Sequence, residues 1–239
     1  MLHRYPAFLL AVFVAMTVVA TAQPAPLRIA TYNILNYPGS TGPARNAQFR
    51  TVVAAMQPHV IVAQELISAM GVELFETDVL DRVFDGRFEA APFVDASGDT
   101  EGAFFYDTTR VTYLQMKIIN TQLRAIEGYR FAVRGTTDTV WIFTVHLKAQ
   151  DTQADAAKRA AEASLLRAHL DSALAGQHFI VAGDFNVYNG TEAALALLLS
   201  AEPNANSRLI DPLNNTGDWH SNRDFAFIHT QSPRTRQFG

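Results

Sequence analysis

The sequence contains no cysteine in its 239 residues. This absence excludes disulfide bridges, thiolate metal sites, cysteine nucleophiles and a lipid-modified N-terminal cysteine. Export remains possible, because a chain of this length can bury a stable core without disulfides. The sequence also lacks a Gly-rich phosphate loop, a His-Glu-x-x-His motif and a serine in an elbow-type context. Phosphate-loop nucleotide binding, zincin-type chemistry and covalent acyl chemistry therefore have no support.

Positively charged residues are fewer than negatively charged ones. Nineteen Lys and Arg residues face 23 Asp and Glu residues, and the formal net charge is −4. Such a protein does not hold a polyanion by charge alone, so metal ions would have to supply the local positive charge for an anionic substrate. Charged residues make up 18% of the chain and hydrophobic residues 49%. This composition favours a folded domain with a sizeable core over disorder.

The longest hydrophobic run lies at the N-terminus. Arg4 precedes an apolar run from Ala7 to Ala20, and small residues follow at Ala20-Thr21-Ala22. We expect a secretory signal peptide over residues 1–22, cleaved after Ala22. A membrane anchor is the alternative, but the run is short for a bilayer span. The prediction is a secreted or periplasmic protein without stable membrane insertion after cleavage.

After residue 22, predicted strands outnumber predicted helices, and helices separate only some of the strands. This pattern favours an α/β sandwich with mixed sheets over a doubly wound parallel sheet. No linker or repeat divides the chain, so residues 23–239 are expected to form one domain. The predicted helices are Arg45–Met56, Ser68–Arg82, Thr152–Leu174 and Thr191–Ser200, with Thr191 as an N-cap and Gly176 as a C-cap. The predicted strands are Leu27–Leu35, Val60–Glu65, Glu89–Val94, Ala103–Tyr106, Val111–Asn120, Tyr129–Arg134, Thr139–His146 and Phe179–Gly183.

Four of the apolar runs carry a polar residue at their ends. The run Phe179–Gly183 leads directly into Asp184 and Asn186, whose side chains project to the same side in extended backbone. Placing polar groups beside a core is unfavourable unless something binds them. The other three runs deliver Asn33, Glu65 and His146. The four runs together predict a site at one rim of the sandwich.

The residue types at this rim suit phosphoryl chemistry with a hard cation. Magnesium is commonly held by one or two carboxylates with several waters, which a residue such as Glu65 can supply. A solvated strand-end carboxylate is the alternative for Glu65. Asn33 can orient the metal ligands or simply form a turn. His146 can be a satisfied core histidine, or it can donate a hydrogen bond to a phosphoryl oxygen or protonate a leaving group.

Asp184 and Asn186 form the more specific pair. A carboxylate that accepts a proton from water, next to an amide that stabilises developing negative charge, suits in-line attack on phosphorus. The types of these two residues therefore suit attack by water on a phosphate ester.

Four segments in this order and spacing resemble the endonuclease/exonuclease/phosphatase superfamily of deoxyribonuclease-like enzymes, in the form found in exported bacterial members. The resemblance runs from about Leu27 to the end of the chain. It implies a four-layer sandwich of two mixed sheets flanked by helices, with a divalent ion at one rim. That ion would be Mg²⁺, or another such as Mn²⁺ or Ca²⁺. The segments are Ala30-Thr31-Tyr32-Asn33-Ile34-Leu35-Asn36, Gln64-Glu65, Thr144-Val145-His146-Leu147 and Gly183-Asp184-Phe185-Asn186.

The same resemblance implies roles for five residues. Asn33 and Glu65 would help to hold the metal ion. His146 would contact the scissile phosphate, Asp184 would orient or activate the water, and Asn186 would stabilise the pentavalent transition state. For Arg124 and Arg234, outside these segments, a phosphate-facing role is one alternative, but we expect exposed surface arginines.

Members of this superfamily normally finish with an Arg-x-Asp strand and a Ser-Asp-His segment. This chain reaches Gly239 before either appears, and His220 and His229 are no obvious replacements. We therefore expect a C-terminally truncated domain that lacks the last strands of one sheet and leaves a sheet edge exposed. This departure puts the activity of the chain itself in question.

The predicted function is hydrolysis of phosphodiester or phosphomonoester bonds by activated water, with nucleic acid as the first candidate substrate. A sphingomyelinase or a sugar-phosphate phosphatase is an alternative. A catalytically inactive exported binding protein that keeps the sandwich is another, because of the missing C-terminal segment. A binuclear calcineurin-like phosphatase is disfavoured, because the Gly-Asn-His-Asp run of its two-metal cage is absent. The sequence does not indicate an oligomeric state.

Overall fold

The computed structural model describes residues 26–174, 176–203, 205–214, 217–220 and 222–228. The predicted signal peptide, residues 1–22, lies outside these ranges, as do His229 and Arg234. Within these ranges, no helix combines the length and the hydropathy that a membrane span needs.

The first sheet is mixed and has the strand order β1-β2-β4-β3. Strand β1 (Ile29–Tyr37) is parallel to β2 (Val60–Leu66). Strand β4 (Glu101–Asp107) is antiparallel to β2, and the short β3 (Phe88–Ala90) is antiparallel to β4. Nearly every residue of β2 and β4 is buried, as expected for central strands covered on both faces.

The second sheet has the order β5-β6-β7-β8. Strands β5 (Val111–Ile119), β6 (Ile126–Val133) and β7 (Thr139–His146) form an antiparallel meander. Strand β8 (His178–Asp184) then joins β7 in parallel. Each sheet therefore contains one parallel pair, and both pairs carry residues of the predicted site.

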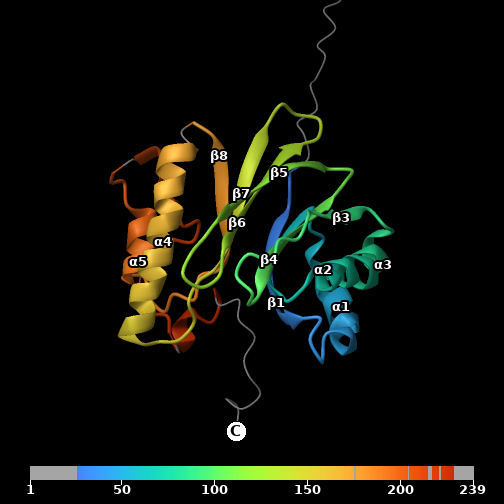
Figure 1. The fold of residues 1–239 in the computed structure, drawn as a ribbon, viewed down its shortest axis with the longest axis horizontal. Helices are drawn as coiled ribbons and strands as arrows, with labels where there is room; N and C mark the ends of the chain where they lie inside the picture. Colours follow the sequence, from blue (N-terminus) through green and yellow to red (C-terminus); the bar gives the residue numbers. More distant parts are fainter. Residues whose placement is uncertain (1–25, 175, 204, 215–216, 221, 229–239) are drawn as a thin grey trace, which may run out of the picture.

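Helices cover the outer face of each sheet (Figure 1). Helices α1 (Asn46–Met56), α2 (Ala69–Phe75) and α3 (Asp81–Phe84) lie on the first sheet, and α4 (Gln153–Ala173) and α5 (Ala193–Leu199) lie on the second. A π-helical turn, Glu76–Leu80, connects α2 to α3. Short 3₁₀ helices occur at Pro43–Arg45, Ala205–Ser207 and Arg223–Phe225. The predicted four-layer α/β sandwich of two mixed sheets is confirmed.

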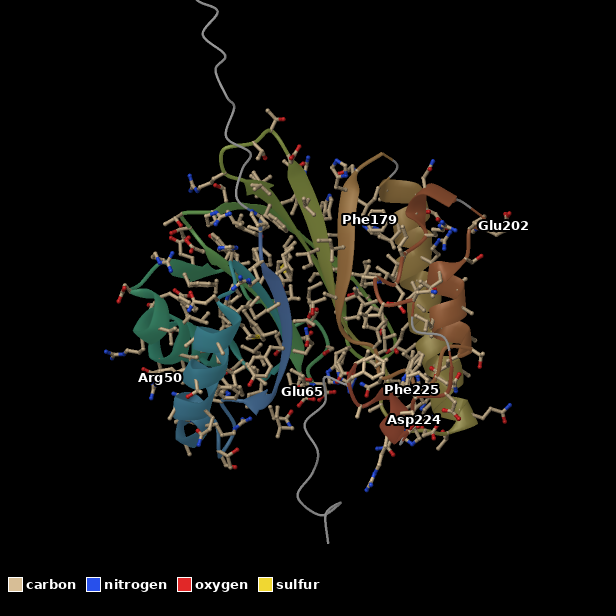
Figure 2. The ribbon with its side chains drawn as sticks, turned by 180° about the vertical axis from the view of Figure 1, so that it is seen from behind. Arg50, Glu65, Phe179, Glu202, Asp224 and Phe225 are labelled. Atoms are coloured by element: carbon tan, nitrogen blue, oxygen red, sulfur yellow. The ribbon has the colours of Figure 1, made fainter. Side chains whose placement is uncertain are left out.

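Three apolar clusters hold the layers together. One packs α1–α3 against the first sheet around Phe75, and another packs α4 and α5 against the second sheet around Leu166. The third joins the inner faces of the two sheets through residues such as Phe104 and Phe131, whose rings stack at 5.6 Å. Phe179 of β8 belongs to the cluster beneath α4 and α5 (Figure 2). Because the two sheets are packed rather than hinged, residues at their common rim have fixed relative positions.

Several predicted element boundaries were wrong. The strand predicted over Glu89–Val94 ends at Ala90, because Pro92 lacks the N–H that a sheet ladder requires. Strands β4 and β6 begin earlier than predicted, at Glu101 and Ile126.

The predicted helix caps also differ from the observed ones. Helix α5 begins after Glu192, not Thr191, and Glu192 makes no side-chain capping bond. Helix α4 ends at Ala173 with Leu174 as its C-cap. Gly176 follows two residues later in left-handed backbone, at φ +75°. The N-terminus of α4 is capped by Thr152, whose hydroxyl accepts a hydrogen bond from the backbone N–H of Asp155.

Candidate functional site

Strands β1, β2, β7 and β8 direct polar side chains to one rim of the sandwich. In the parallel pair β1–β2, Asn33 lies opposite Gln64, next to Glu65. In the parallel pair β7–β8, His146 lies opposite Asp184. Glu65 is at the edge of the molecule, where the two sheets come together (Figure 2).

The side chain of Asn33 joins the two sheets at this rim. Its Nδ2 donates to Glu65 Oε1 at 2.8 Å and to Asp184 Oδ2 at 3.2 Å. His146 Nε2 lies 3.8 Å from the same Glu65 oxygen. Asn186 is connected to Asp184 through its backbone N–H, which donates to Asp184 Oδ1 at 3.1 Å. The structure thus brings all five predicted site residues together.

Backbone strain is concentrated at the same rim. Four of the eight described non-glycine residues with positive φ are Leu35, Asn36, Glu65 and Asn186, with φ between 48° and 67°. A left-handed conformation is costly for a leucine or a glutamate, and strained residues of this kind cluster at functional sites. The backbone N–H of Asn36 donates to Glu65 Oε2 at 3.1 Å, so the strained turn of β1 orients the Glu65 carboxylate.

Gly183 sets the position of Asp184. Its φ is +141°, and a Cβ at this position would lie 2.1 Å from the carbonyl oxygen of Val145. Only glycine lets β8 approach β7 this closely. The backbone N–H of Leu147 then donates to the Asp184 carbonyl at 3.0 Å, which fixes Asp184 beside His146.

The Asn186 side chain turns back toward β7. Its Nδ2 donates to the carbonyl oxygen of Leu147 at 3.0 Å. A carboxamide nitrogen carries two hydrogens, so one remains for a ligand at the rim. The same contact holds the residue in its left-handed conformation next to Asp184.

The site is acidic and largely shielded from solvent. The side chains of Glu65 and His146 are 15% and 12% exposed. Among the residues that the structure describes, no lysine or arginine forms an ion pair with Glu65 or Asp184. Burial, together with the nearby charge of Arg124, lowers the pKa of His146, while the two carboxylates act in the opposite direction. His146 Nδ1 is buried and has no hydrogen-bond partner in the described part of the chain.

These residues fit a hard divalent cation with few protein ligands. Two carboxylates that have no lysine or arginine ion pair among the described residues share one amide, and oxygen donors of this type bind Mg²⁺ with waters completing the octahedron. Asn33 Oδ1 accepts a hydrogen bond from Leu35 N, so Asn33 orients the carboxylates through its nitrogen. Across the described ranges there is no cluster of three or more His, Cys, Asp or Glu arranged as a metal cage.

The sequence profile of the Endonuclease/Exonuclease/phosphatase family matches residues 30–235. The chain belongs to this family. Solved structures with the same fold include humanized D. rerio TDP2, which is 21% identical with a TM-score of 0.55 and coverage of 71% of this chain and 66% of that chain. The human Nocturnin catalytic domain with bound sulfate is 19% identical with a TM-score of 0.57, covering 74% and 70%. A mannosyl-6-phosphatase of Bacteroides thetaiotaomicron is 18% identical with a TM-score of 0.56, covering 72% and 69%.

The match covers less than two thirds of the full length of the TDP2 structures, 66% of the humanized D. rerio protein and 62% of D. rerio TDP2 complexed with single-strand DNA product. No curated protein matches this sequence. At these identities, the solved structures support the fold of the family.

A second set of contacts supports the rim site from the interior of the sandwich. Gln64 Nε2 donates to Thr144 Oγ1 at 3.0 Å, and Thr31 Oγ1 donates to Gln64 Oε1 at 3.3 Å. These bonds connect β1, β2 and β7 one layer beneath the rim. Because Gln64 is buried, its amide links the two sheets in an environment where water cannot replace it.

Arg124 is part of this support, which corrects the expectation of a surface arginine. Its side chain is 15% exposed and forms an ion pair with Asp99 at 3.4 Å. Its Nη1 donates to the carbonyl oxygen of His146 at 3.1 Å. Arg124 therefore places a positive charge next to His146 of the rim site.

Helix α4 anchors the segment that follows β7. Arg159 of α4 is fully buried, donates to the carbonyl oxygens of Lys148 and Gln150 at 2.7 and 2.9 Å, and is ion-paired with Glu192. The backbone N–H of Lys148 donates to Glu162 of the same helix at 2.9 Å. The segment that follows His146 is therefore held by a positively charged and a negatively charged residue of α4, Arg159 and Glu162.

Sequence reasoning missed a pair of buried carboxylates beneath the site, Glu101 of β4 and Glu127 of β6. Glu127 Oε1 accepts a hydrogen bond from the backbone N–H of Gly102 at 2.8 Å. Burial, with the neighbouring Glu101, raises the pKa of Glu127 to about 8. The predicted strands begin two residues too late in β4 and three too late in β6, so each carboxylate falls in a predicted loop. The signal that the sequence offers for this pair is one glutamate near the start of each apolar strand.

Proposed function

We propose that the chain is a metal-dependent phosphoesterase that hydrolyses phosphodiester or phosphomonoester bonds by attack of an activated water. The observation that supports this most is the Asn33 amide, which joins the carboxylates of Glu65 and Asp184 from different sheets next to His146. Family membership supports a hydrolase of this class.

The chain's own residues supply positioning, a base and hydrogen-bond donors. Asp184 is the proposed base, because its carboxylate is oriented by Asn33 and by the backbone of Asn186. His146 and Asn186 are the proposed donors to the phosphoryl oxygens. Glu65, with Asn33, would hold the divalent cation, which when bound stabilises the developing charge on the phosphate.

Nucleic acid is the first candidate substrate. One of the structural neighbours, D. rerio TDP2, was solved with a single-strand DNA product, and another is a mannosyl-6-phosphatase. Because the chain is acidic overall, a sugar phosphate or a lipid headgroup such as that of sphingomyelin is the second candidate. Secretion or export to the periplasm is part of the same proposal and rests on residues 1–22.

The function is tested by a hydrolysis screen of the full chain over DNA, RNA, sphingomyelin and phosphosugars, with Mg²⁺ or with excess chelator. We expect turnover of at least one of these substrates only when the cation is present. Asp184→Asn should reduce turnover by about 100-fold or more. Its control is Asp138→Asn, because Asp138 lies in the exposed turn before β7, at the opposite rim.

Full activity in chelator, or unchanged activity of Asp184→Asn, would contradict the proposal. Binding of a divalent cation without turnover of any substrate would instead favour the inactive exported binding protein. Circular dichroism of each variant separates loss of function from loss of fold.

A further inference from the structure

A pocket of about 390 Å³ lies on the outer face of the second sheet, beneath the C-terminal part of α4. Strands β5, β6 and β7 form its floor with Lys117, Arg130 and Trp141, and α4 contributes His169 and Ala173. Its volume is within the range of small-molecule sites. Trp141 and His146 are five residues apart on β7, so the pocket is roughly 17 Å along the strand from the rim site.

The pocket is positively charged in an acidic protein. Its lining includes Lys117 and Arg130 and no Asp or Glu. Neither cation forms an ion pair with any described residue. Arg130 Nη2 donates to Thr139 Oγ1 at 3.2 Å, but its Nε is buried and has no acceptor in the part of the chain described here. A buried N–H without an acceptor is unfavourable, and an anion in the pocket would supply one.

The other walls are aromatic and fixed in place. Trp141 stacks on Phe143 at 5.7 Å, and the edge of His169 meets Phe143 at 5.6 Å. Trp141 Nε1 donates to Gln177 Oε1 at 3.0 Å. Gly128, which lies opposite Lys117 in the sheet, adds no side chain, and a Cβ there would collide with Phe143. The open volume next to the two cations therefore follows from the packing.

The C-terminal end of α4 is the one unfavourable feature for an anion, because helix carbonyls carry partial negative charge. Two of these carbonyls are already bonded, since Gln177 donates to Ala173 from its side chain and to Leu174 from its backbone. Burial and the charge of Lys117 lower the pKa of His169, so its ring is a neutral hydrogen-bonding group. The fixed positive charges of the pocket are thus Lys117 and Arg130.

We propose that this pocket binds a small phosphate monoester, with the phosphate between Lys117 and Arg130 and the organic part against Trp141. The two positive charges match the dianion of a phosphate monoester better than the single charge of a carboxylate. The volume exceeds that of phosphate alone, which leaves room for an organic group. The proposal is independent of catalysis at the rim.

The chain has two tryptophans, which provides a direct probe. Trp219→Phe leaves Trp141, in the pocket wall, as the only tryptophan. The emission of this variant is titrated in excess chelator with glucose 6-phosphate, inorganic phosphate, glucose and acetate. Chelator keeps a cation-dependent ligand out of the rim site. We expect the emission to change saturably with glucose 6-phosphate, with a half-saturating concentration at least about tenfold lower than that of inorganic phosphate. Glucose and acetate should cause no change.

Two substitutions remove the cations while keeping most of the side-chain stem. Arg130→Met and Lys117→Met should each weaken glucose 6-phosphate binding by about tenfold or more. Arg82→Met, in the exposed part of α3, removes the same charge elsewhere and should change nothing. Lys117 is exposed on an edge strand, so Lys117→Met tests the site even where Arg130→Met does not fold.

No saturable response to glucose 6-phosphate, or an equal response in Lys117→Met and wild-type pockets, would overturn the proposal. Equal affinity for inorganic phosphate would overturn the assignment to an organic phosphate. Tighter binding of a short oligonucleotide than of glucose 6-phosphate would overturn the assignment to a small molecule.

Discussion

The two carboxylates of the rim site stand on strands of opposite character. Glu65 is the penultimate residue of β2, which lies between β1 and β4 and is buried along almost its whole length. Asp184 ends β8, which pairs only with β7 within the described structure and leaves Ile180 37% exposed. Glu65 is thus held by a packed central strand. The position of Asp184 depends on local contacts made by Gly183, Leu147 and Asn33.

This difference indicates that the two carboxylates have different functions, which mutations can test. A residue on a central strand suits a permanent function such as holding a cation. A residue on an edge strand can be placed accurately only where specific bonds and a glycine fix it.

The largest effect is expected in catalysis. Asp184→Asn should reduce kcat by about 100-fold or more even at saturating Mg²⁺, because it removes the proposed base. Glu65→Gln should instead raise the Mg²⁺ concentration required for half-maximal activity, because it removes a ligand charge. Steady-state kinetics over a range of Mg²⁺ concentrations distinguish these outcomes. Identical Mg²⁺ dependence in the two variants would contradict the assignment of different functions to Glu65 and Asp184.

Gly183→Ala should be the most destabilising change on β8. The added Cβ would clash with the Val145 carbonyl at a positive φ, and the expected loss in the free energy of unfolding is about 3 kcal/mol or more. Gly86→Ala is the control, because Gly86 has positive φ but nothing within 4 Å of the added Cβ, and it should lose about 1 kcal/mol. Urea denaturation measures both. Equal losses would show that the close approach of β7 and β8 is not needed.

The buried pair Glu101–Glu127 should make stability depend on pH. The pKa of Glu127 is about 8 in the folded state, above the ordinary value of 4.5. Between these values the folded state binds the extra proton, so stability falls as pH rises, by roughly 1 kcal/mol per pH unit. Glu127→Gln keeps the acceptor for Gly102 and removes this titration.

Thermal melts from pH 5 to about 8 should therefore show a flatter pH dependence for Glu127→Gln than for the wild type, with the largest gain at the alkaline end. Glu202→Gln, at an exposed glutamate, is the control and should follow the wild type. Parallel curves for Glu127→Gln and the wild type would show that Glu127 is not protonated in the folded protein.

The smallest effect is expected for the bond between Gln64 and Thr144, which connects the two halves. A double-mutant cycle of Gln64→Ala and Thr144→Val should give a coupling energy of about 1 kcal/mol. Chemical denaturation of the four proteins measures it. A coupling energy near zero would mean that this bond does not hold the sheets together.

The fold was largely predictable, because apolar runs with polar ends define strands such as β2, β7 and β8. Boundaries were less predictable. The start of β6 was missed because Glu127 is charged in sequence but accepts a backbone hydrogen bond inside the sandwich. The π-helical turn at Glu76–Leu80 leaves no periodic signal distinct from an α-helix, so one long helix was predicted where three segments occur.

The residues of the site were predictable from where the strands end, but their contacts were not. The bridging amide of Asn33 reaches Asp184, which is 151 positions away, and no local pattern specifies such a bond. Arg124 was expected at the surface, because sequence gives no sign that its guanidinium reaches the His146 carbonyl. The first contact depends on how the two sheets pack together, and the second on how the segment between β5 and β6 folds against the end of β7.

The central claim is that a cation held by Glu65 of the first sheet lies beside His146 of the second. It is tested most directly by NMR of the seven histidines while paramagnetic Mn²⁺ is added in place of Mg²⁺. The account predicts that the ring signals of His146 broaden first, that those of His178 at the opposite end of β8 do not, and that Glu65→Gln abolishes the selectivity. Broadening of His146 that survives Glu65→Gln, or broadening that does not favour His146, would contradict it.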